Sequence, residues 1–506
     1  MRLITIRPPR QSINILVVIV LILTILTASI NCTAGTQQTN ITARMDDDNS
    51  LIFHIQGSVQ GSGKVTVEYW SDEIGPFITA PVSTEGSRFS IELIRLRATT
   101  QYNFKVFLAK STNSPVLQYE GNFTTGPLPK GLQDAKFDLI QGKPTYGLVL
   151  LDFNDTDFNG IVIIDSDGKV VWYYQHDKQV FAIAQRDNHE LVFNENSRII
   201  GYSMMDIAPD GRKILSVNDT LENGEISQPH GRWHHELLLM PDNKVWTLGC
   251  EIRSVNINGN NTLQVGDTIE EWDTSTGKVT RLVSLFDLLD PVKDRTDASN
   301  TTTGFIWEGS QDQYEGITED WTHANSISVL PDGNILVSIR HLNQIIAIKP
   351  DFSGIAWRLG GPESDFTFPN PSDQFYHQHD ARMLPNGHIL LFDNGNFRPD
   401  DQGGRYSRAL ELELNFTTMQ ARKVWEYRNK PDLYASAVGS VVRLENGNTV
   451  IIYGVATVND PGILTLVEAD KAGNAAAITK ISSPGKTVQY RAIPIDTING
   501  ETKSQS

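Results

Sequence analysis

Cysteine is nearly absent from this sequence, and so is any helical pattern. Its 506 residues include two cysteines, Cys32 and Cys250. Cys32 lies near the point where a leader peptide would be cut, so a mature chain would keep Cys250 alone and could form no internal disulfide. A disulfide-stabilised scaffold is therefore excluded. No segment sustains the spacing of apolar residues that a helix needs, which predicts a chain built from strands.

Positive charge is also scarce. There are 43 Lys and Arg residues against 60 Asp and Glu residues, which gives a formal net charge of −17. Nucleic acid is therefore excluded as a partner, because phosphate binding needs a basic surface. A small anionic substrate remains compatible, since surface fields fade within about 8 Å at physiological salt. The hydrophobic content of 39% and the charged content of 20% are typical of a globular protein.

The N-terminus carries the pattern of a targeting segment. Arg2, Arg7 and Arg10 precede an uncharged apolar stretch at 15–30, and small residues follow it. This predicts a signal peptide over residues 1–34, with a membrane-anchoring signal as the alternative, because the run is near the lower limit for a span. In both cases we expect the rest of the chain to be secreted or to lie on the non-cytoplasmic side. Seven sequons beyond the predicted signal segment favour a glycoprotein: Asn40, Asn122, Asn154, Asn218, Asn260, Asn300 and Asn415.

The next segment reads as a small β-sandwich, which we place at residues 35–128. Short alternating runs such as KVTVEYW and YNFKVFLAK are separated by Gly and Ser. In LRATTQYNFKVFL, Leu96 and Tyr102 resemble the tyrosine corner of a fibronectin type III domain. We expect this module to support the main domain, with a spacer or adhesion role as the alternative. Residues 129–142, which begin with Pro129, predict a linker.

The remainder of the chain repeats a short unit. Turns of the form APDG, MPDN, LPDG and LPNG are each followed by a β-rich run, and a strand–turn–Trp strand such as IVIIDSDGKVVWYY often follows. Two hairpins per unit form a four-stranded blade, so we predict a six-bladed β-propeller over residues 143–496, with a tail at 497–506. Insertions at 286–319 and 397–408 are expected at a rim. The blades are expected to start near Tyr146, Val180, His235, His323, His379 and Ala435.

Three histidines occupy matching points of this repeat. His235 and His379 each lie six residues before the proline of the turn, and His323 lies eight before it. Because six and eight differ by two, we expect the three side chains on the same face of their strands. The first strand of each blade lines the channel of a propeller, so these imidazoles should surround one pocket. Arg340 ends the run NILVSIR, and its guanidinium suits a small oxyanion.

Longer motifs around these residues resemble one enzyme family. EDWTHANSISVLPDGNILVSIRH, YHQHDARMLPNGHILLFDNGN, SRALELEL and KVWEYR, in this order, resemble the arylsulfate sulfotransferases, which do not use a nucleotide sulfate donor. The resemblance covers residues 143–478 and implies an all-β chain, a six-bladed propeller preceded by a small β-sandwich. It also implies ping-pong transfer of a sulfuryl group from an aryl sulfate donor to a phenolic acceptor, through a sulfohistidine and without a cofactor or metal.

The resemblance also implies roles for single residues. The histidine after Gln in HQHD, His379, would be the nucleophile, and His323 and Arg340 would assist it. Of the HH pair, the repeat register favours His235 as the fourth catalytic residue. His377 faces the same side as His379, so the choice between them stays open. The candidates for substrate binding are Asn325, His377, His234 and Asn394.

Two other functions compete with sulfuryl transfer. The histidine cluster could hold zinc or copper in a metal-dependent propeller hydrolase or lyase. We expect no metal, because no carboxylate occupies a matching channel position and Arg340 would repel a cation. A non-catalytic binding propeller, secreted or on the cell surface, is the third class, and it predicts that His379→Asn changes nothing. Nothing in the sequence indicates an oligomeric state.

Overall fold

The computed structural model confirms the all-β fold class. It describes residues 40–110, 114–197, 201–218, 231–296, 318–455, 462–485 and 488–504. Within these ranges the α-helix is limited to α1 (Lys130–Gln133). No helix in the described part of the chain is long and apolar enough to cross a membrane. The predicted signal segment and most of the insertion at 286–319 lie outside the described residues.

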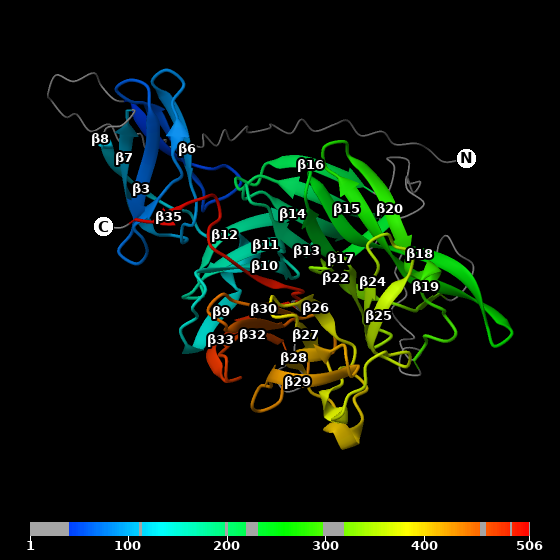
Figure 1. Cartoon of the computed structure of the whole chain (residues 1–506). Coiled ribbons are helices and arrows are strands. Elements are labelled where there is room, and N and C mark those ends of the chain that lie inside the picture. The colour runs from blue at the N-terminus through cyan, green and yellow to red at the C-terminus, as the bar shows by residue number, and fades with distance from the viewer. Residues whose placement is uncertain are drawn as a thin grey trace, which may run out of the picture. The chain divides into compact units, whose positions relative to one another are not determined.

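The N-terminal part of the described chain folds into two sheets (Figure 1). Burial alternates along β3 and β7, so one face of each strand packs inward and the other meets solvent. Leu96 and Tyr102 are buried, and the backbone N–H of Arg97 donates to the Tyr102 hydroxyl at 2.8 Å. The fibronectin III resemblance stays a prediction. One sheet contains β1 (Ile41–Met45), β2 (Phe53–Ser58) and β6 (Arg88–Leu93), and the other contains β3 (Lys64–Trp70), β4 (Phe77–Ile78), β5 (Val82–Ser83), β7 (Gln101–Ala109), β8 (Val116–Thr124) and β35 (Thr502–Lys503).

The first half of the propeller contains three antiparallel sheets. In each sheet the consecutive strands are joined by hairpins, because the turns seen in the sequence connect neighbouring strands, and in the first sheet β34 adds the edge strand beside β10. The first sheet is β10 (Leu148–Asn154), β11 (Asn159–Asp165), β12 (Val170–His176) and the distant β34 (Ala492–Ile495); the second is β13 (Gln179–Gln185), β14 (Leu191–Ser197), β15 (Gly201–Ile207) and β16 (Lys213–Asn218); the third is β17 (Gly231–Met240), β18 (Lys244–Ile257), β19 (Asn260–Asp273) and β20 (Lys278–Ser284), with β21 (Thr318–Asp320) beside β19.

Three more sheets complete the described propeller. Six sheets in the described residues agree with the six predicted blades, and the blade number itself stays a prediction. The fourth sheet is β22 (Ala324–Val329), β23 (Ile335–Ile339), β24 (Gln344–Ile348) and β25 (Ile355–Gly360); the fifth is β26 (His379–Met383), β27 (Ile389–Asp393), β28 (Arg408–Asn415) and β29 (Gln420–Tyr427); the sixth is β30 (Ser440–Arg443), β31 (Thr449–Tyr453), β32 (Ile463–Ala469), β33 (Ala475–Ser482) and β9 (Lys136–Gly142).

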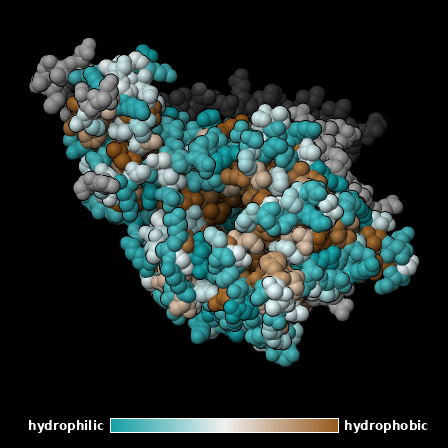
Figure 2. Space-filling view, viewed as in Figure 1, coloured by the Kyte–Doolittle hydropathy of each residue, from teal (hydrophilic) through white to brown (hydrophobic). Residues whose placement is uncertain are grey.

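The first strands gather around a common centre. β10, β13, β17, β22, β26 and β30 lie together in the middle of Figure 1, and each contacts the next around the ring, with β34 between β30 and β10. Apolar side chains from facing sheets fill the space between blades; Trp172 and Trp272, for example, are fully buried there. Figure 2 shows that the surface near this centre is hollowed, with apolar residues in the wall of the hollow.

The segments on either side of the predicted propeller contain strands that the predicted linker and tail did not include. Part of the predicted linker at 129–142 forms β9, which pairs with β33. The predicted tail at 497–506 contains β35, which pairs with β4 of the sandwich. A sheet edge leaves backbone donors and acceptors unpaired, and these terminal strands satisfy them. The sequon at Asn154 is also buried, at 4% exposure, and its side-chain amide donates to the Val180 carbonyl, so this site is unsuited to a glycan in the folded chain.

Candidate active site

The structure brings the three predicted histidines together. The ring centroid of His235 lies 5.1 Å from that of His323 and 6.3 Å from that of His379. They come from three sheets, on β17, at the entry to β22 and at the start of β26. His235 and His323 are partly exposed, whereas His379 is 1% exposed. Tyr490 packs against two of these rings, at 5.2 Å from His235 and 6.1 Å from His379.

Regular strand alternation is not what places these side chains. Strand pairing shifts register in all three sheets between the histidine and the turn, so period two is interrupted there. His235 and His323 adopt the left-handed backbone conformation, with φ of 58° and 53°, as does His377 with 53°. Non-glycine residues rarely adopt it, and bulges of this kind re-aim side chains. Strained residues of this sort cluster at functional sites.

His379 is held by a neutral amide. Its Nδ1 lies 2.7 Å from the Asn394 side-chain oxygen. The Asn394 amide nitrogen donates to the carbonyls of Ala435 and Val438 at 2.8 and 2.9 Å, which fixes the oxygen toward the imidazole. Nδ1 of His379 must then carry the proton, because an amide oxygen only accepts. The lone pair of the ring is therefore on Nε2.

Arg340 supplies the positive charge of the site. Its Nη2 donates to the Ser436 carbonyl at 3.0 Å, and the Asn396 amide donates to the same oxygen at 2.9 Å. Burial lowers the pKa of Arg340 to about 10, which still leaves it charged at neutral pH. Burial, with Arg340 adding to it, lowers the pKa of His379 well below its ordinary value. His379 is therefore neutral across the physiological range.

His323 is backed by a carboxylate. Its Nδ1 lies 2.5 Å from Asp320, and its ring stacks on that of His341 at 4.7 Å between centroids. Nδ1 of His341 bonds to the Asp320 carbonyl oxygen at 2.8 Å. Burial, reinforced by the charge of Arg340, lowers the pKa of His323 to about 3. The neutral ring then donates Nδ1–H to the carboxylate and leaves Nε2 as an acceptor.

His235 is linked to a second carboxylate through its neighbour. Nδ1 of His234 lies 2.7 Å from Nδ1 of His235, and Nε2 of His234 lies 3.1 Å from Asp267. Burial and then the neighbouring imidazoles lower the pKa of His235 well below its usual value. Asp267, His234 and His235 form one polar chain that ends at the cluster of histidines.

The remaining candidate residues are buried around the three clustered histidines. The Asn325 amide donates to the Gln378 carbonyl at 2.7 Å, and the residue is fully buried. His377 is also fully buried beside Phe397 and His341, and neither of its ring nitrogens has a hydrogen-bond partner among the described residues. Burial, followed by the charge of Arg340, lowers the pKa of His377 far below its ordinary value.

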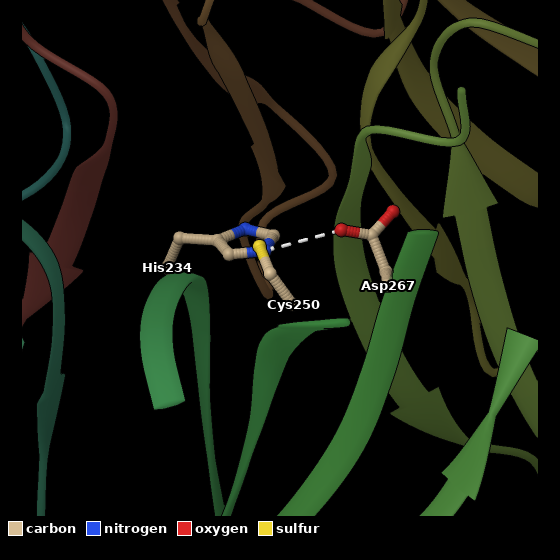
Figure 3. A group of neighbouring side chains, drawn as sticks. All are labelled: His234, Cys250 and Asp267. Carbon is tan, nitrogen blue, oxygen red and sulfur yellow. Dashed lines mark ion pairs between the residues drawn. The ribbon is translucent and has the colours of Figure 1, made fainter. Parts of the chain in front are cut away.

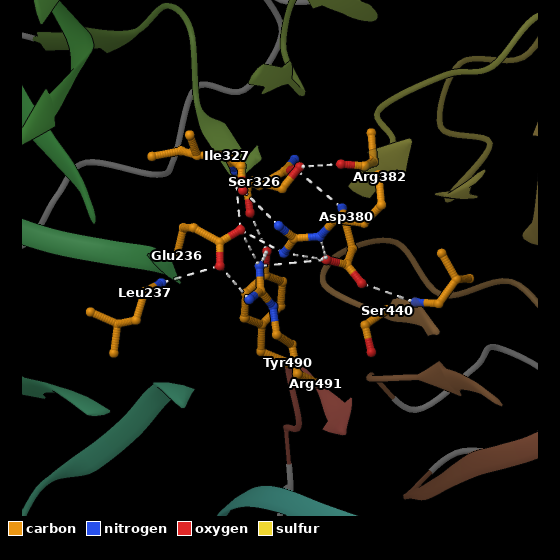
Figure 4. A network of polar contacts seen from close by, with 12 residues as sticks. Glu236, Leu237, Ser326, Ile327, Asp380, Arg382, Ser440, Tyr490 and Arg491 are labelled. Carbon is orange, nitrogen blue, oxygen red and sulfur yellow. Dashed lines mark hydrogen bonds and ion pairs between the residues drawn. The ribbon is translucent and has the colours of Figure 1, made fainter. Parts of the chain in front are cut away.

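One expectation about the channel was wrong, because carboxylates do occupy matching positions. Glu236 and Asp380 each lie five residues before a turn proline, and they meet Arg382 and Arg491 on the axis (Figure 4). Arg491 donates to both oxygens of Glu236, at 2.6 and 2.9 Å. Burial would raise the pKa of Glu236, but the two guanidinium groups outweigh it and hold that pKa at about 2. The repeat register could have found both acids.

For other residues of the site the sequence pattern gave no indication. Tyr490 and Arg491 stand next to β34, which reaches the first sheet from the far end of the chain. The Tyr490 hydroxyl donates to the Asn325 carbonyl, so it fixes the entry to β22. Asp320 was part of the DWTHANS motif, but its contact with His323 depends on the turn between them. These groups become visible only in the folded chain.

Comparison with known proteins adds a family. The sequence model of a family described as arylsulfotransferase (ASST) matches residues 134–492. None of the curated proteins matches the chain. The match includes strands of all six sheets of the described propeller and every candidate residue of the site.

Solved structures resemble the chain distantly. A protein of unknown function from Bacteroides caccae is 16% identical with a TM-score of 0.39, and the match covers 68% of this chain and 99% of that one. A streptogramin B lyase is 10% identical, with a TM-score of 0.34 and coverage of 70% and 99%. An inactive virginiamycin B lyase from Staphylococcus aureus, with quinupristin, is 13% identical, with a TM-score of 0.34 and coverage of 70% and 97%.

Proposed function

This chain belongs to the arylsulfotransferase (ASST) family, and from that premise we propose that it moves a sulfuryl group from an aryl sulfate to a phenol through a covalent sulfohistidine. The family match supports aryl sulfotransferase activity in general, with small aryl sulfates and phenols as substrates. The observation that carries the finer proposal is the state of His379. It is a buried, neutral imidazole whose Nδ1 faces the oxygen of Asn394.

The nucleophile is Nε2 of His379. In the first half of the reaction its lone pair attacks the sulfur of the donor, an N–S bond forms, and the bond from sulfur to the aryl oxygen breaks. The leaving aryl oxygen takes a proton that solvent supplies through Nε2 of His323. In the second half the oxygen of the acceptor phenol attacks the same sulfur, the N–S bond breaks, and the acceptor proton passes to Nε2 of His323 and back to solvent. His379 ends as it began.

Electrostatics account for most of the proposed rate gain. A sulfuryl group in transfer spreads negative charge over three oxygens, and positioned donors in a water-poor site stabilise that charge. Arg340 is held by the Ser436 carbonyl and is 7% exposed, so its charge is weakly screened. Its guanidinium can bond two oxygens at once. His235, a partly exposed ring, is suited to donate to another of these oxygens.

His323 is suited to proton transfer. In the resting protein it is neutral, and its Nε2 can accept the proton of the incoming phenol. The imidazolium that forms is stabilised by Asp320, 2.5 Å from Nδ1. The same imidazolium gives its proton to the leaving phenolate when the reaction runs in the other direction. Asp320 is therefore a positioning residue that acts through His323.

Intact mass spectrometry tests the covalent step. Protein mixed with an aryl sulfate such as nitrophenyl sulfate, without a phenol, should gain the mass of one sulfuryl group, and phenol should remove it. His379→Asn should gain nothing. If the mass gain persists in His379→Asn and is lost in His377→Asn, the nucleophile is His377. No gain in the wild-type protein with several donors would overturn the mechanism and favour a non-catalytic binding propeller.

We further propose an extracytoplasmic location, carried by the N-terminal pattern at residues 1–34. Expression in cells with a tag at the C-terminus tests it. The chain should reach the medium or the outer face of the membrane. N-terminal sequencing of that product then distinguishes a cleaved signal peptide from a retained anchor. A cytosolic product of full length would contradict both.

A further inference from the structure

We propose that His234, Cys250 and Asp267 bind one Zn²⁺ ion beside the histidine pocket. This site goes beyond sulfuryl transfer, because no step proposed for His379 uses a metal. Figure 3 shows the three side chains turned toward one another. One ligand atom from each of them lies within 4.8 Å of the other two. All three are buried, with exposures of 6%, 7% and 2%.

The sheet itself builds this group. His234 is on β17, Cys250 on β18 and Asp267 on β19, which are consecutive strands of the third sheet. Cys250 stands directly opposite Asp267 in the strand register. Directly opposed residues project from the same face with their Cβ atoms close together. The register shifts on either side of His234 turn its ring toward that pair.

The donor set selects the metal. A thiolate, an imidazole and a carboxylate are the ligands that Zn²⁺ takes in proteins, whereas Mg²⁺ and Ca²⁺ take oxygen alone. With Cys250 as thiolate and Asp267 ionised, the two negative charges balance a divalent cation. Tetrahedral ligands about 2.1 Å from zinc are about 3.4 Å apart. Nε2 of His234 is 3.1 Å from Asp267 Oδ1, so a small shift admits the ion.

Neighbouring groups hold the ligands in place. The Asp267 Oδ2 atom accepts from the Thr322 hydroxyl and the Ala324 backbone N–H, each at 2.5 Å, which turns Oδ1 toward His234. Nδ1 of His234 contacts Nδ1 of His235 at 2.7 Å. Metal-binding histidines almost always donate a hydrogen bond from their second nitrogen, and His235 is the acceptor available here. Three protein ligands leave a fourth position for water.

A second group of potential ligands is less suited to an ion. Asp320, His323 and His341 also bring their ligand atoms within 4.8 Å of one another. However, Nδ1 of His323 is 2.5 Å from the Asp320 carboxylate, far shorter than two ligands of one tetrahedral ion can be. That contact is a hydrogen bond. We therefore assign the metal to the third sheet and the proton chemistry to the fourth.

A zinc ion at this site would determine which ring nitrogen of His235 carries the proton. Zinc takes the lone pair of His234 Nε2, so His234 Nδ1 carries a hydrogen and donates it to Nδ1 of His235. A neutral His235 must then carry its own hydrogen on Nε2, as a donor. Cys250 loses its thiol proton to solvent when the ion binds. The ion would act on the pocket through this tautomer and would not contact the substrate.

Metal analysis of the full-length protein tests the site without any substrate. After incubation with Zn²⁺ alone and gel filtration, we expect one zinc per chain, and Co²⁺ in its place should give the absorption band of a thiolate–cobalt bond. Cys250→Ala should abolish the cobalt band and lower zinc affinity at least about 10-fold. The control is His388→Gln, which removes a partly exposed histidine in the turn before β27 and should leave both signals unchanged.

Three results would overturn the zinc site. The first is wild-type protein that binds no zinc when the metal is supplied in excess. The second is zinc bound without a thiolate–cobalt band, which is readable even if Cys250→Ala does not fold. The third is zinc lost in His341→Gln but kept in Cys250→Ala. Sulfuryl transfer is measured separately by mass gain on His379, so either proposal can fail while the other stands.

Discussion

The three clustered histidines differ in the group that lies behind each ring. His379 faces a neutral amide, Asn394, whereas His323 faces the carboxylate of Asp320. His235 reaches the carboxylate of Asp267 through His234. An amide oxygen fixes the tautomer and favours the charged ring less than a carboxylate does, and burial and Arg340 still keep His379 neutral, which suits a nucleophile that must keep its lone pair. A carboxylate stabilises an imidazolium, which suits a ring that gains and loses a proton.

Removing the nucleophile should have the largest effect. His379→Asn keeps a polar group of similar size in the buried site but has no ring nitrogen to attack sulfur. We expect kcat/KM for transfer from nitrophenyl sulfate to a phenol to fall at least about 10³-fold. Nitrophenol release in steady state measures it. A fall of the same size in His388→Gln would show that the assay responds to general damage and not to loss of the nucleophile.

Exchanging the amide for an acid should make His379 behave like His323. Asn394→Asp puts a carboxylate behind Nδ1 and raises the pKa of His379, so the ring protonates and loses its lone pair as pH falls. The acid limb of the rate profile should move to higher pH, with a loss of about 10²-fold near pH 6. Rates from pH 5 to 9 measure it. An unshifted acid limb would mean that Asn394 does not control His379.

The variant also loses the amide donors to Ala435 and Val438, so its stability must be followed by urea unfolding in parallel. Asn394→Ala is the matched control, because it loses the same donors without adding a charge. The two variants should unfold at similar urea concentrations near neutral pH. Only Asn394→Asp should show the shifted acid limb.

The opposite exchange should weaken proton transfer. Asp320→Asn keeps the shape of the side chain but no longer stabilises an imidazolium at His323. We expect transfer to fall about 10- to 100-fold. The loss should be larger for donors whose phenol is a poor leaving group, because those need the proton most. Rates with a series of aryl sulfates test how the loss depends on the leaving group. An equal loss for every donor would argue that Asp320 only supports the fold.

Protonation of the buried histidines should lower the free energy of unfolding at acid pH. For each histidine this is the smallest of the effects expected here. The folded pKa of His323 and of His341 is about 3, below the ordinary value of 6.5. Each contributes stability that is complete above about pH 6.5 and is lost as pH falls toward 3. At pH 5 the loss is about 2 kcal/mol for each. Urea unfolding of wild type and His341→Gln at pH 7.5 and 5 measures it, and equal losses in both would contradict the assignment.

Much of the site was readable from repeat spacing. The turn signals located the first strands, and matching positions predicted the cluster of His235, His323 and His379, whose ring centroids are 5.1 and 6.3 Å apart. The spacing argument was incomplete, because register shifts and left-handed residues aim the rings, and alternation does not. It also missed the acids at Glu236 and Asp380, although these two occupy matching positions, each five residues before a turn proline.

The sequence by itself determined the all-β chain, the repeat and the residue types that face the axis, because these depend on local pattern and period. Only the tertiary structure decided which partner each imidazole has. Asn394, Asp320 and Asp267 reach their histidines through turns and neighbouring strands, and Tyr490 arrives from the far end of the chain. A hydrogen bond depends on distances of tenths of an ångström, and such distances are set when the whole ring of sheets closes.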